Sequence, residues 1–244
     1  MKTYRADLHI HSVLSPCGDL DMSPVTIIEK AQEAHLDIIG ITDHNSTRQC
    51  PLIKSLGQKA GILVLCGAEV TSHEEVHCLA LFENDKELLL FQNYLDLHLP
   101  NFPNNTELFG YQVVVDENDF IIYEEEKLLI SAINQNINEI EKMVHSLNGL
   151  FIPAHIDKLS NSLLSQLGFI PSDLIVDAIE VTSHADIGQL QKRPDLQNKG
   201  FIRNSDAHYP GQIGSAFTLF ELESPSFQEI LLALKNQNNR RICI

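Results

Sequence analysis

The chain contains several short apolar runs that carry histidine or acidic residues at or near their C-terminal ends, and this recurring pattern constrains the fold more than any other feature. Runs of this length, rich in Ile, Leu and Val, predict buried strands. Besides the N-terminal stretch DLHIHS, the runs span residues 36–44, 61–70, 76–82, 149–156, 176–184 and 200–208.

Amphipathic stretches between these runs predict helices. The stretch 23–35 begins with Ser23, a favoured N-cap, followed by Pro24 at the first turn. Two more helices are predicted over 138–148 and 224–237. Strands that alternate with helices favour the α/β class, with a mainly parallel sheet that is open or closed into a barrel. In either form, functional groups collect at the C-terminal ends of the strands.

Residues 83–137 interrupt this alternation. The segment LPNFPNN predicts a loop, and YQVVVDENDFIIYEEE predicts a β-hairpin around Asp116–Asp119. Because no linker-like composition flanks this region, we interpret it as an insertion in a single domain that spans residues 1–244.

Charge and cysteine content limit the expected partners and compartment. The 244 residues include 33 acidic and 17 basic ones, which gives a formal net charge of −16. Such a charge repels polyanions at long range, so we expect a small phosphorylated substrate, no duplex nucleic acid and no membrane. The five cysteines form no C-x-x-C pair, and no leader or apolar span is evident, which predicts a reduced, cytoplasmic protein. The sequence leaves the oligomeric state open.

The stretch DLHIHS places Asp7, His9 and His11 at alternate positions. Alternate side chains of a strand share a face, and two imidazoles with a carboxylate suit a metal ion better than a core. Imidazole and carboxylate together suit zinc, iron or manganese, and the number of candidates exceeds the four ligands of one zinc, which predicts two or three divalent ions. The later runs add Asp43, His44, Glu69, His77, His155, Asp206 and His208.

In this order the motifs resemble those of the PHP (polymerase and histidinol phosphatase) domain phosphoesterases. DLHIHS resembles the first motif, TDHN the second, Glu69 with His77 the third, PAHID the next and SDAH the last, over about residues 5–220. The resemblance implies a distorted, TIM-barrel-like (β/α)7 barrel with a trinuclear centre. The implied ligands are His9, His11, Glu69 and Asp206 for one ion, Glu69, His77 and His155 for a second, and His44, His208 and Cys17 for a third, with Asp19 as a rival to Cys17.

Other residues are given supporting roles or set aside. We expect Asp7 and Asp43 to accept the far N–H of ligating imidazoles, which fixes the tautomer. Lys158 is expected to contact a substrate phosphate, because a point cation there could hold a non-bridging oxygen. The alternatives are His73 as a rival to His77, Glu180 and His184 as lining residues, Arg203 as a cation that faces away, and His35, His98 and His145 with no role.

These observations predict a metal-dependent hydrolase of a small phosphate ester, a phosphomonoester or short nucleotide, in which a metal-bridging hydroxide attacks phosphorus in line. The sequence has no G-x-S-x-G elbow or P-loop that would indicate another mechanism. One alternative is a metal-dependent amidohydrolase, which commonly bridges its ions with a carboxylated lysine, where this chain has Glu69. The other is a non-catalytic metal-binding module, which would be expected to have lost ligands.

Overall fold

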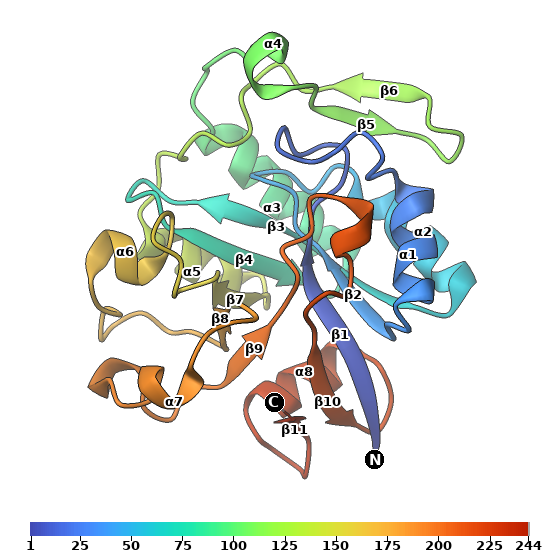
Figure 1. The fold of residues 1–244 in the computed structure, drawn as a ribbon. Helices are drawn as coiled ribbons and strands as arrows, with labels where there is room; N and C mark the ends of the chain where they lie inside the picture. The colour runs from blue at the N-terminus through green and yellow to red at the C-terminus, as the bar shows by residue number, and fades with distance from the viewer. Residues whose placement is uncertain (244) are drawn as a thin grey trace.

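The computed structural model describes residues 1–243, and its centre is a curled sheet of seven strands (Figure 1). Across the sheet the strands follow the order β11-β10-β1-β2-β3-β4-β7. Their bounds are Lys2–Ile10 (β1), Ile38–Ile41 (β2), Leu63–Thr71 (β3), His77–Phe82 (β4), Leu150–Pro153 (β7), Thr218–Leu222 (β10) and Arg241–Cys243 (β11).

The sheet is mixed rather than mainly parallel. The pairs β1–β2 and β2–β3 are parallel, whereas β3–β4, β4–β7, β1–β10 and β10–β11 are antiparallel. The turn between β3 and β4, residues 72–76, is too short for the crossover that parallel neighbours require. The α/β class is confirmed, but the expectation of a mainly parallel sheet is wrong for this sheet. The distorted (β/α)7 barrel is not confirmed, because the continuous backbone pairing forms a half-barrel.

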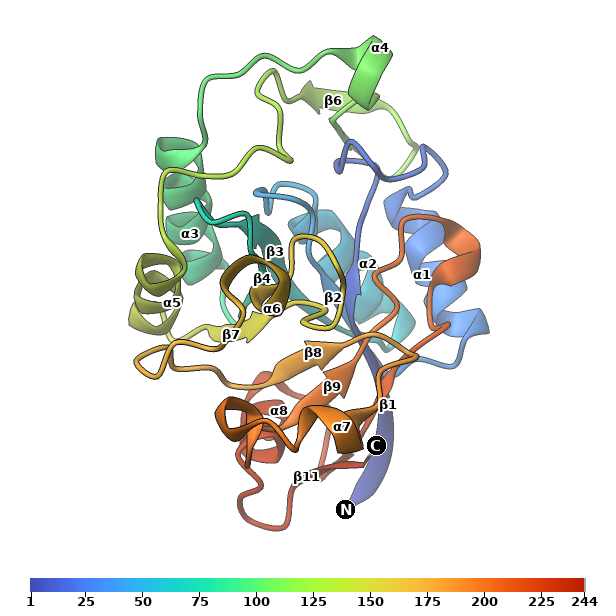
Figure 2. The same ribbon diagram turned by 60° about the vertical axis from the view of Figure 1, so that its left-hand side comes forward.

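A second, two-stranded parallel sheet lies on the open side of this half-barrel (Figure 2). It consists of β8 (Ile179–Val181) and β9 (Phe201–Arg203). A few backbone hydrogen bonds join it to its neighbours. On the β7 side, Asp177 N donates to the carbonyl of Phe151 and Ile156 N to that of Glu180, both at 3.0 Å. On the β1 side, His11 N donates to the carbonyl of Ala207 at 3.0 Å, and Ala207 N donates to that of His9 at 3.3 Å. The barrel is thus completed by scattered contacts rather than by a continuous ladder.

Two hydrophobic clusters line the two faces of the main sheet, one under the helices and one within the curl. The inner cluster includes Leu65 of β3 and Leu79 of β4. Since side chains of a strand alternate between faces, Glu69 lies on the face of Leu65, and His77 on the face of Leu79. The inner face therefore changes from apolar to polar toward one end of the barrel, which is where the candidate ligands lie.

Most of the longer helices cover the outer face, whereas α8 (Phe227–Leu234) packs against the inner cluster, and most helix positions follow from apolar spacing and caps. Ser23 accepts a hydrogen bond from Thr26 N at the start of α1, and α2 ends at Gly61, whose φ of +76° suits glycine. No helix within residues 1–243 is both long and apolar enough to cross a membrane. The longer helices are α1 (Pro24–Glu33), α2 (Cys50–Ala60), α3 (Asp85–His98), α5 (Ile137–Ser146) and α8 (Phe227–Leu234); α6 (Leu163–Leu167) and α7 (Ile187–Leu190) are short.

Residues 83–137, interpreted above as an insertion, contribute one helix to the hydrophobic core and a hairpin whose second strand is exposed. The predicted hairpin is confirmed: β5 (Val113–Val115) pairs with β6 (Ile121–Glu124) across a turn closed by Asp116 N and the carbonyl of Phe120. Helix α3 was not predicted, although its buried residues Leu88, Phe91 and Leu95 have helical spacing. A short helix, α4 (Thr106–Phe109), precedes the hairpin.

Candidate metal centre

His9 and His11 present their Nε2 atoms to the same point. His9 Nδ1 lies 3.0 Å from both carboxylate oxygens of Glu180, and His11 Nδ1 lies 3.0 Å from the hydroxyl of Ser15, which donates to Asp43. In the neutral form of each ring, Nδ1 therefore carries the proton and Nε2 carries a lone pair. The two Nε2 atoms are 3.1 Å apart, an unfavourable approach of two acceptors unless a cation lies between or beside them.

Two carboxylates complete this group. Asp206 Oδ1 lies 3.3 Å from Nε2 of both His9 and His11, and it is buried without a hydrogen bond. Glu69 approaches the same two nitrogens at 3.4 Å. Although burial alone would lower it, the pKa of His9 is raised well above its ordinary value by Glu180, Asp206 and Glu69. The site therefore has a strongly negative potential that a metal ion would satisfy.

Glu69 is the centre of the cluster. Its carboxylate, only 1% exposed, lies 2.9 Å from His77 Nδ1, 3.1 Å from His155 Nε2 and 3.2 Å from His44 Nδ1. Burial would raise the pKa of Glu69, but His77, His9 and His44, together with a hydrogen bond from His11, lower it well below its usual range. A carboxylate surrounded by imidazoles from several strands has the position needed to bridge two ions.

Three sets of potential ligands have atoms that lie within 4.8 Å of one another. His208 belongs to the set that contains sulfur, and its Nδ1 donates to the carbonyl of Asp206 at 2.8 Å, which leaves Nε2 free. Burial and the nearby His11 lower the pKa of His208 to about 4, so the ring is a neutral ligand at pH 7. The sets are His9, His11, Glu69 and Asp206; His44, Glu69 and His77; and His11, Cys17, His44 and His208.

Three residues at the ends of strands that bear these ligands have a left-handed backbone conformation. His155 and Asp206 have φ values of +29° and +52°, and Asn45, next to His44, has +45°. Residues other than glycine rarely adopt the left-handed region of backbone conformation, and those that do are often found at functional sites. Asn45 is held there by its own side chain, which donates to the carbonyls of Leu129 and Ser131 at 2.7 and 2.9 Å.

The carboxylates expected to orient the ligands have partly different partners. Asp7 accepts backbone N–H groups of Ser205 and Gly214, both at 3.0 Å, and contacts no imidazole among the described residues. The cause is an irregularity in the β1–β2 register between Asp7 and Ile10, which breaks the alternation on which the prediction relied. Burial also raises the pKa of Asp7 to about 6. Asp43 acts on His11 through a hydroxyl rather than directly.

Sequence reasoning undervalued two residues that orient ligands. Glu180, 2% exposed, accepts from His9 Nδ1, from His155 N at 2.9 Å and from Asn204 Nδ2 at 2.7 Å. The expected position of Glu180 on the pocket-facing side of its strand could have identified it as an orienting residue. Ser15 lies between His11 and Asp43, and nothing in the sequence distinguishes it from other serines.

The remaining candidates fall inside or outside the cluster. His77 contacts Glu69, whereas the rival His73 is exposed. Lys158 Nζ forms an ion pair with Asp206 Oδ2, so this cation borders the centre. Arg203 donates to the carbonyl of Ala185 at 3.0 Å, and His184 is exposed. Asp19 belongs to none of the three ligand sets.

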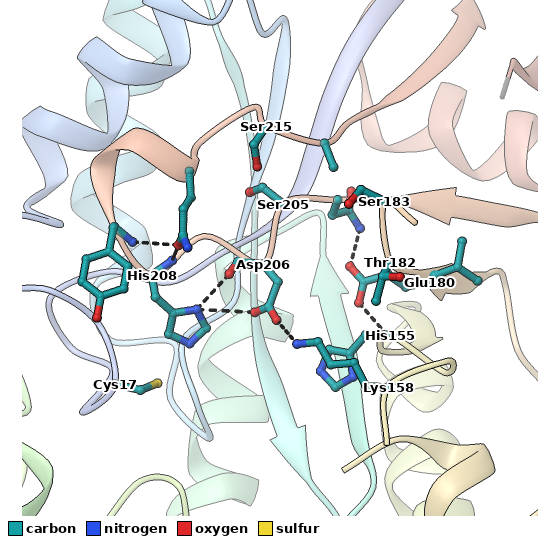
Figure 3. Close-up of a pocket in the computed structure, with 15 residues that line it drawn as sticks. Cys17, His155, Lys158, Glu180, Thr182, Ser183, Ser205, Asp206, His208 and Ser215 are labelled. Atoms are coloured by element: carbon teal, nitrogen blue, oxygen red, sulfur yellow. Dashed lines mark hydrogen bonds and ion pairs between the residues drawn. The ribbon is translucent and has the colours of Figure 1, made fainter. Parts of the chain in front are cut away.

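A cavity of about 520 Å³ opens beside the centre (Figure 3). In the view, His208 and Cys17 lie on one side, and His155, Lys158 and Glu180 lie together on the other, with Asp206 between the two groups. A second hollow of about 350 Å³ shares several of these residues and adds His44, Glu69 and His77. The centre is therefore open to a ligand from solvent.

Imidazoles and carboxylates converge at the strand ends of this α/β fold. The chain is therefore an α/β protein with a site able to bind metal ions. Within that class the chain belongs to the PHP domain family, whose model matches residues 7–167. A PHP-associated model matches residues 196–239, which include Asp206 and His208.

Over an alignment of 275 positions, gaps included, the chain is 26% identical to the uncharacterized protein YqxK of Bacillus subtilis (strain 168), with 99% of this chain and 64% of that protein covered. The lesion-specific endonuclease PfuEndoQ of Pyrococcus furiosus shares the fold with a TM-score of 0.75 at 23% identity, over 99% of this chain and 58% of that one. A protein of Bifidobacterium adolescentis, proposed to be a metal-dependent phosphoesterase, has a TM-score of 0.61 at 18% identity, over 94% and 96% of the two chains. This chain thus spans less than two thirds of the length of YqxK and of PfuEndoQ.

A further structure corrects the expectation about partners. Endonuclease Q has been solved with a 27-mer duplex substrate that has an abasic lesion at the active site, and it shares this fold with a TM-score of 0.73. The exclusion of duplex nucleic acid, and with it the restriction to a small substrate, was therefore wrong. Net charge sums the whole surface, whereas binding depends on the local field, to which bound cations contribute strongly.

Proposed function

We propose that this chain is a metal-dependent phosphoesterase. The observation that carries the proposal is the convergence of His9 Nε2, His11 Nε2 and Asp206 Oδ1, three acceptors with no donor among residues 1–243. Divalent ions held there would lower the pKa of a coordinated water and neutralise phosphoryl oxygens, as multi-ion sites do in displacement at phosphorus.

The other side chains around the cavity have roles that suit a phosphate ester. Glu180 and Ser15 hold the rings of His9 and His11 in the tautomer that leaves Nε2 free. Lys158, whose side chain is 40% exposed, provides a cation at the mouth for a non-bridging oxygen once Asp206 is engaged with an ion. Because donors come from both matched regions, we propose that residues 1–244 act as one unit.

The substrate that we propose is a phosphodiester of a nucleic-acid strand. The shared fold with endonuclease Q, including a complex with lesion-bearing duplex, supports this choice over a small phosphomonoester. The cavity of about 520 Å³ beside the centre also has room for more than a bare phosphate group. Since the chain spans 58% of that endonuclease, strand cleavage by this chain alone is part of the proposal.

The test is a substrate panel with protein loaded with manganese or zinc. The panel contains duplexes with and without an abasic site, bis(p-nitrophenyl) phosphate, p-nitrophenyl phosphate, an amide and a lactone. We expect diester hydrolysis that falls by about a thousandfold in His9→Ala and Asp206→Ala, a loss of about 4 kcal/mol in transition-state stabilisation. Exposed His73→Ala is the matched control and should retain full activity.

Each other outcome decides against part of the proposal. Hydrolysis of the amide or lactone alone would replace it with an amidohydrolase. Turnover of p-nitrophenyl phosphate without either diester would keep the phosphoesterase and overturn the nucleic-acid substrate. Activity that survives loss of His9 and Asp206 would place the chemistry elsewhere.

A further inference from the structure

The ligand set formed by His11, Cys17, His44 and His208 differs in chemistry from the other two, because it contains a thiol and no carboxylate. Its four ligand atoms lie within 4.8 Å of one another. Cys17 is on the loop that follows β1 and is exposed as a residue, but it lines both cavities at the centre. Figure 3 shows its sulfur directed toward the side on which His208 and Asp206 lie.

Two imidazoles of this set have a ring nitrogen without a hydrogen bond among residues 1–243. His44 is 5% exposed, and its Nδ1 makes no hydrogen bond, although it lies 3.2 Å from Glu69 Oε2. His208 Nδ1 is used by the carbonyl of Asp206, so that Nε2 faces the centre as an acceptor. A metal ion would provide a partner for both of these nitrogen atoms, as it would for the ligand atoms of the set that contains His9 and Asp206.

The loop that carries Cys17 is fixed to the element that carries His208. Asp19 N donates to the carbonyl of His208, and Gly18 N donates to the carbonyl of Ser15, both at 2.8 Å. The carboxylate of Asp19 is used locally, where Oδ1 accepts from Asp21 N at 2.8 Å. The local structure thus favours the thiol over this carboxylate as the donor from the loop.

We propose that Cys17 is a thiolate ligand, together with His44 and His208, of an outer metal site that prefers zinc to manganese. His11 has one free nitrogen, which it shares with the His9 group, and His44 also belongs to the set of Glu69 and His77. With His44 assigned to the outer ion and His11 to the His9 group, three donors hold the outer ion and a fourth position is open, as in catalytic zinc sites. Thiolate favours zinc over manganese, whereas carboxylate-rich sites suit manganese or iron. The inference rests on the metal binding of the proposed function, and it makes the centre chemically heterogeneous.

The experiment uses cobalt as a spectroscopic probe of sulfur ligation. We expect the cobalt-loaded protein to show thiolate-to-metal charge-transfer absorption in the near ultraviolet. Cys17→Ser should abolish this band, Cys17→Asp should abolish it while retaining the ion, and Cys243→Ser should leave it unchanged. Metal analysis after dialysis should find one ion fewer per chain in Cys17→Ala than in wild type. In zinc–manganese competition, Cys17→Asp should shift loading toward manganese by about tenfold or more.

The results separate this inference from the proposed function. A band that persists in Cys17→Ser, or an ion count that is the same in Cys17→Ala, would overturn the thiolate ligand while diester hydrolysis by the loaded protein still supported the phosphoesterase. A protein that retains no ion at all would overturn both. Circular dichroism of the ion-free variants, which should melt as wild type does, excludes misfolding as the cause of lost ions.

Discussion

The two sides of the metal centre are held in place in different ways. On the sheet side, Glu69 and His77 belong to β3 and β4, which pair residue by residue with each other. On the other side, Asp206 and His208 follow β9, which pairs only with β8 in a separate sheet. Backbone ladders therefore fix one half of the ligands, and a few side chains and a few backbone hydrogen bonds fix the other half.

The side chains that join the β8–β9 side to the sheet form a short connected network. Asn204 Oδ1 accepts from Leu8 N at 2.7 Å, and its Nδ2 donates to Glu180 at the same distance. Glu180 in turn contacts His9 and His155. The geometry of the centre should consequently tolerate loss of a donor from the sheet better than loss of this network.

The largest effect on activity is expected for Glu69→Gln, because it removes the carboxylate that contacts ligands from four segments. We expect hydrolysis to fall by about a thousandfold or more, about 4 kcal/mol. The fold should remain, since β3 pairs with both β2 and β4. Rate measurements with circular dichroism test both parts, and Glu75→Gln, at an exposed position, is the control. An unfolded variant would contradict the stability assigned to the sheet side.

The next largest effect is expected for Glu180→Gln, which removes the charge that orients His9 and leaves an amide against His155 N and Asn204. We expect metal affinity to fall by about 10- to 100-fold. The free energy of unfolding of the ion-free protein should also fall by about 2 kcal/mol. Calorimetric titration and thermal melting measure these quantities. Affinity within twofold of wild type would mean that the β8–β9 side is held by something else.

The comparison also shows what the sequence could predict. Apolar runs, most of them with polar residues at or near their ends, indicated β2, β3, β4, β7, β8 and β9, and they singled out Glu69 and His77 as candidate ligands. These signals are local to one strand. The sheet edge formed by β10 and β11 was not predicted, because these short strands follow no polar motif and depend on pairing with β1, over 200 residues away.

The failures at the site have the same physical origin. The role of Asp7 depended on unbroken alternation, and the β1–β2 irregularity removes it. Glu180 was placed on the correct face, but its importance depends on His155 and Asn204, which only the tertiary fold brings to it. Donor types and strand ends are thus readable from the chain, whereas the contacts that orient donors are not.

Ser15→Ala is expected to have a smaller effect than Glu180→Gln, although it removes the partner of the other paired imidazole. Asp43 retains its hydrogen bonds from Ser12 N and the Ser12 hydroxyl, at 2.7 and 2.6 Å, so the carboxylate stays satisfied. We expect a loss of about 1 kcal/mol in stability and less than tenfold in metal affinity. The same titrations apply. If the two variants proved equal, the proposed asymmetry between the two sides would be wrong.

The smallest effect, and the one that depends on pH, is expected for His145→Gln at the far end of the β8–β9 side. His145 Nε2 lies 3.0 Å from Asp177, which precedes β8 and also accepts from Phe151 N at 2.9 Å. The hydrogen bond to Asp177 is the main cause that raises the pKa of His145 above its ordinary value, with burial opposing it and Glu141 assisting.

A histidine whose pKa is raised on folding stabilises the native state fully below its unfolded pKa of about 6.5, and this contribution disappears as pH rises through the folded value. Wild type should therefore exceed His145→Gln by about 1 kcal/mol near pH 6, and the two should converge in alkaline solution. Denaturant unfolding at several pH values measures the difference, with exposed His184→Gln as a control that should not differ from wild type. A difference that does not change with pH would show that packing, rather than the charge on His145, anchors the start of β8.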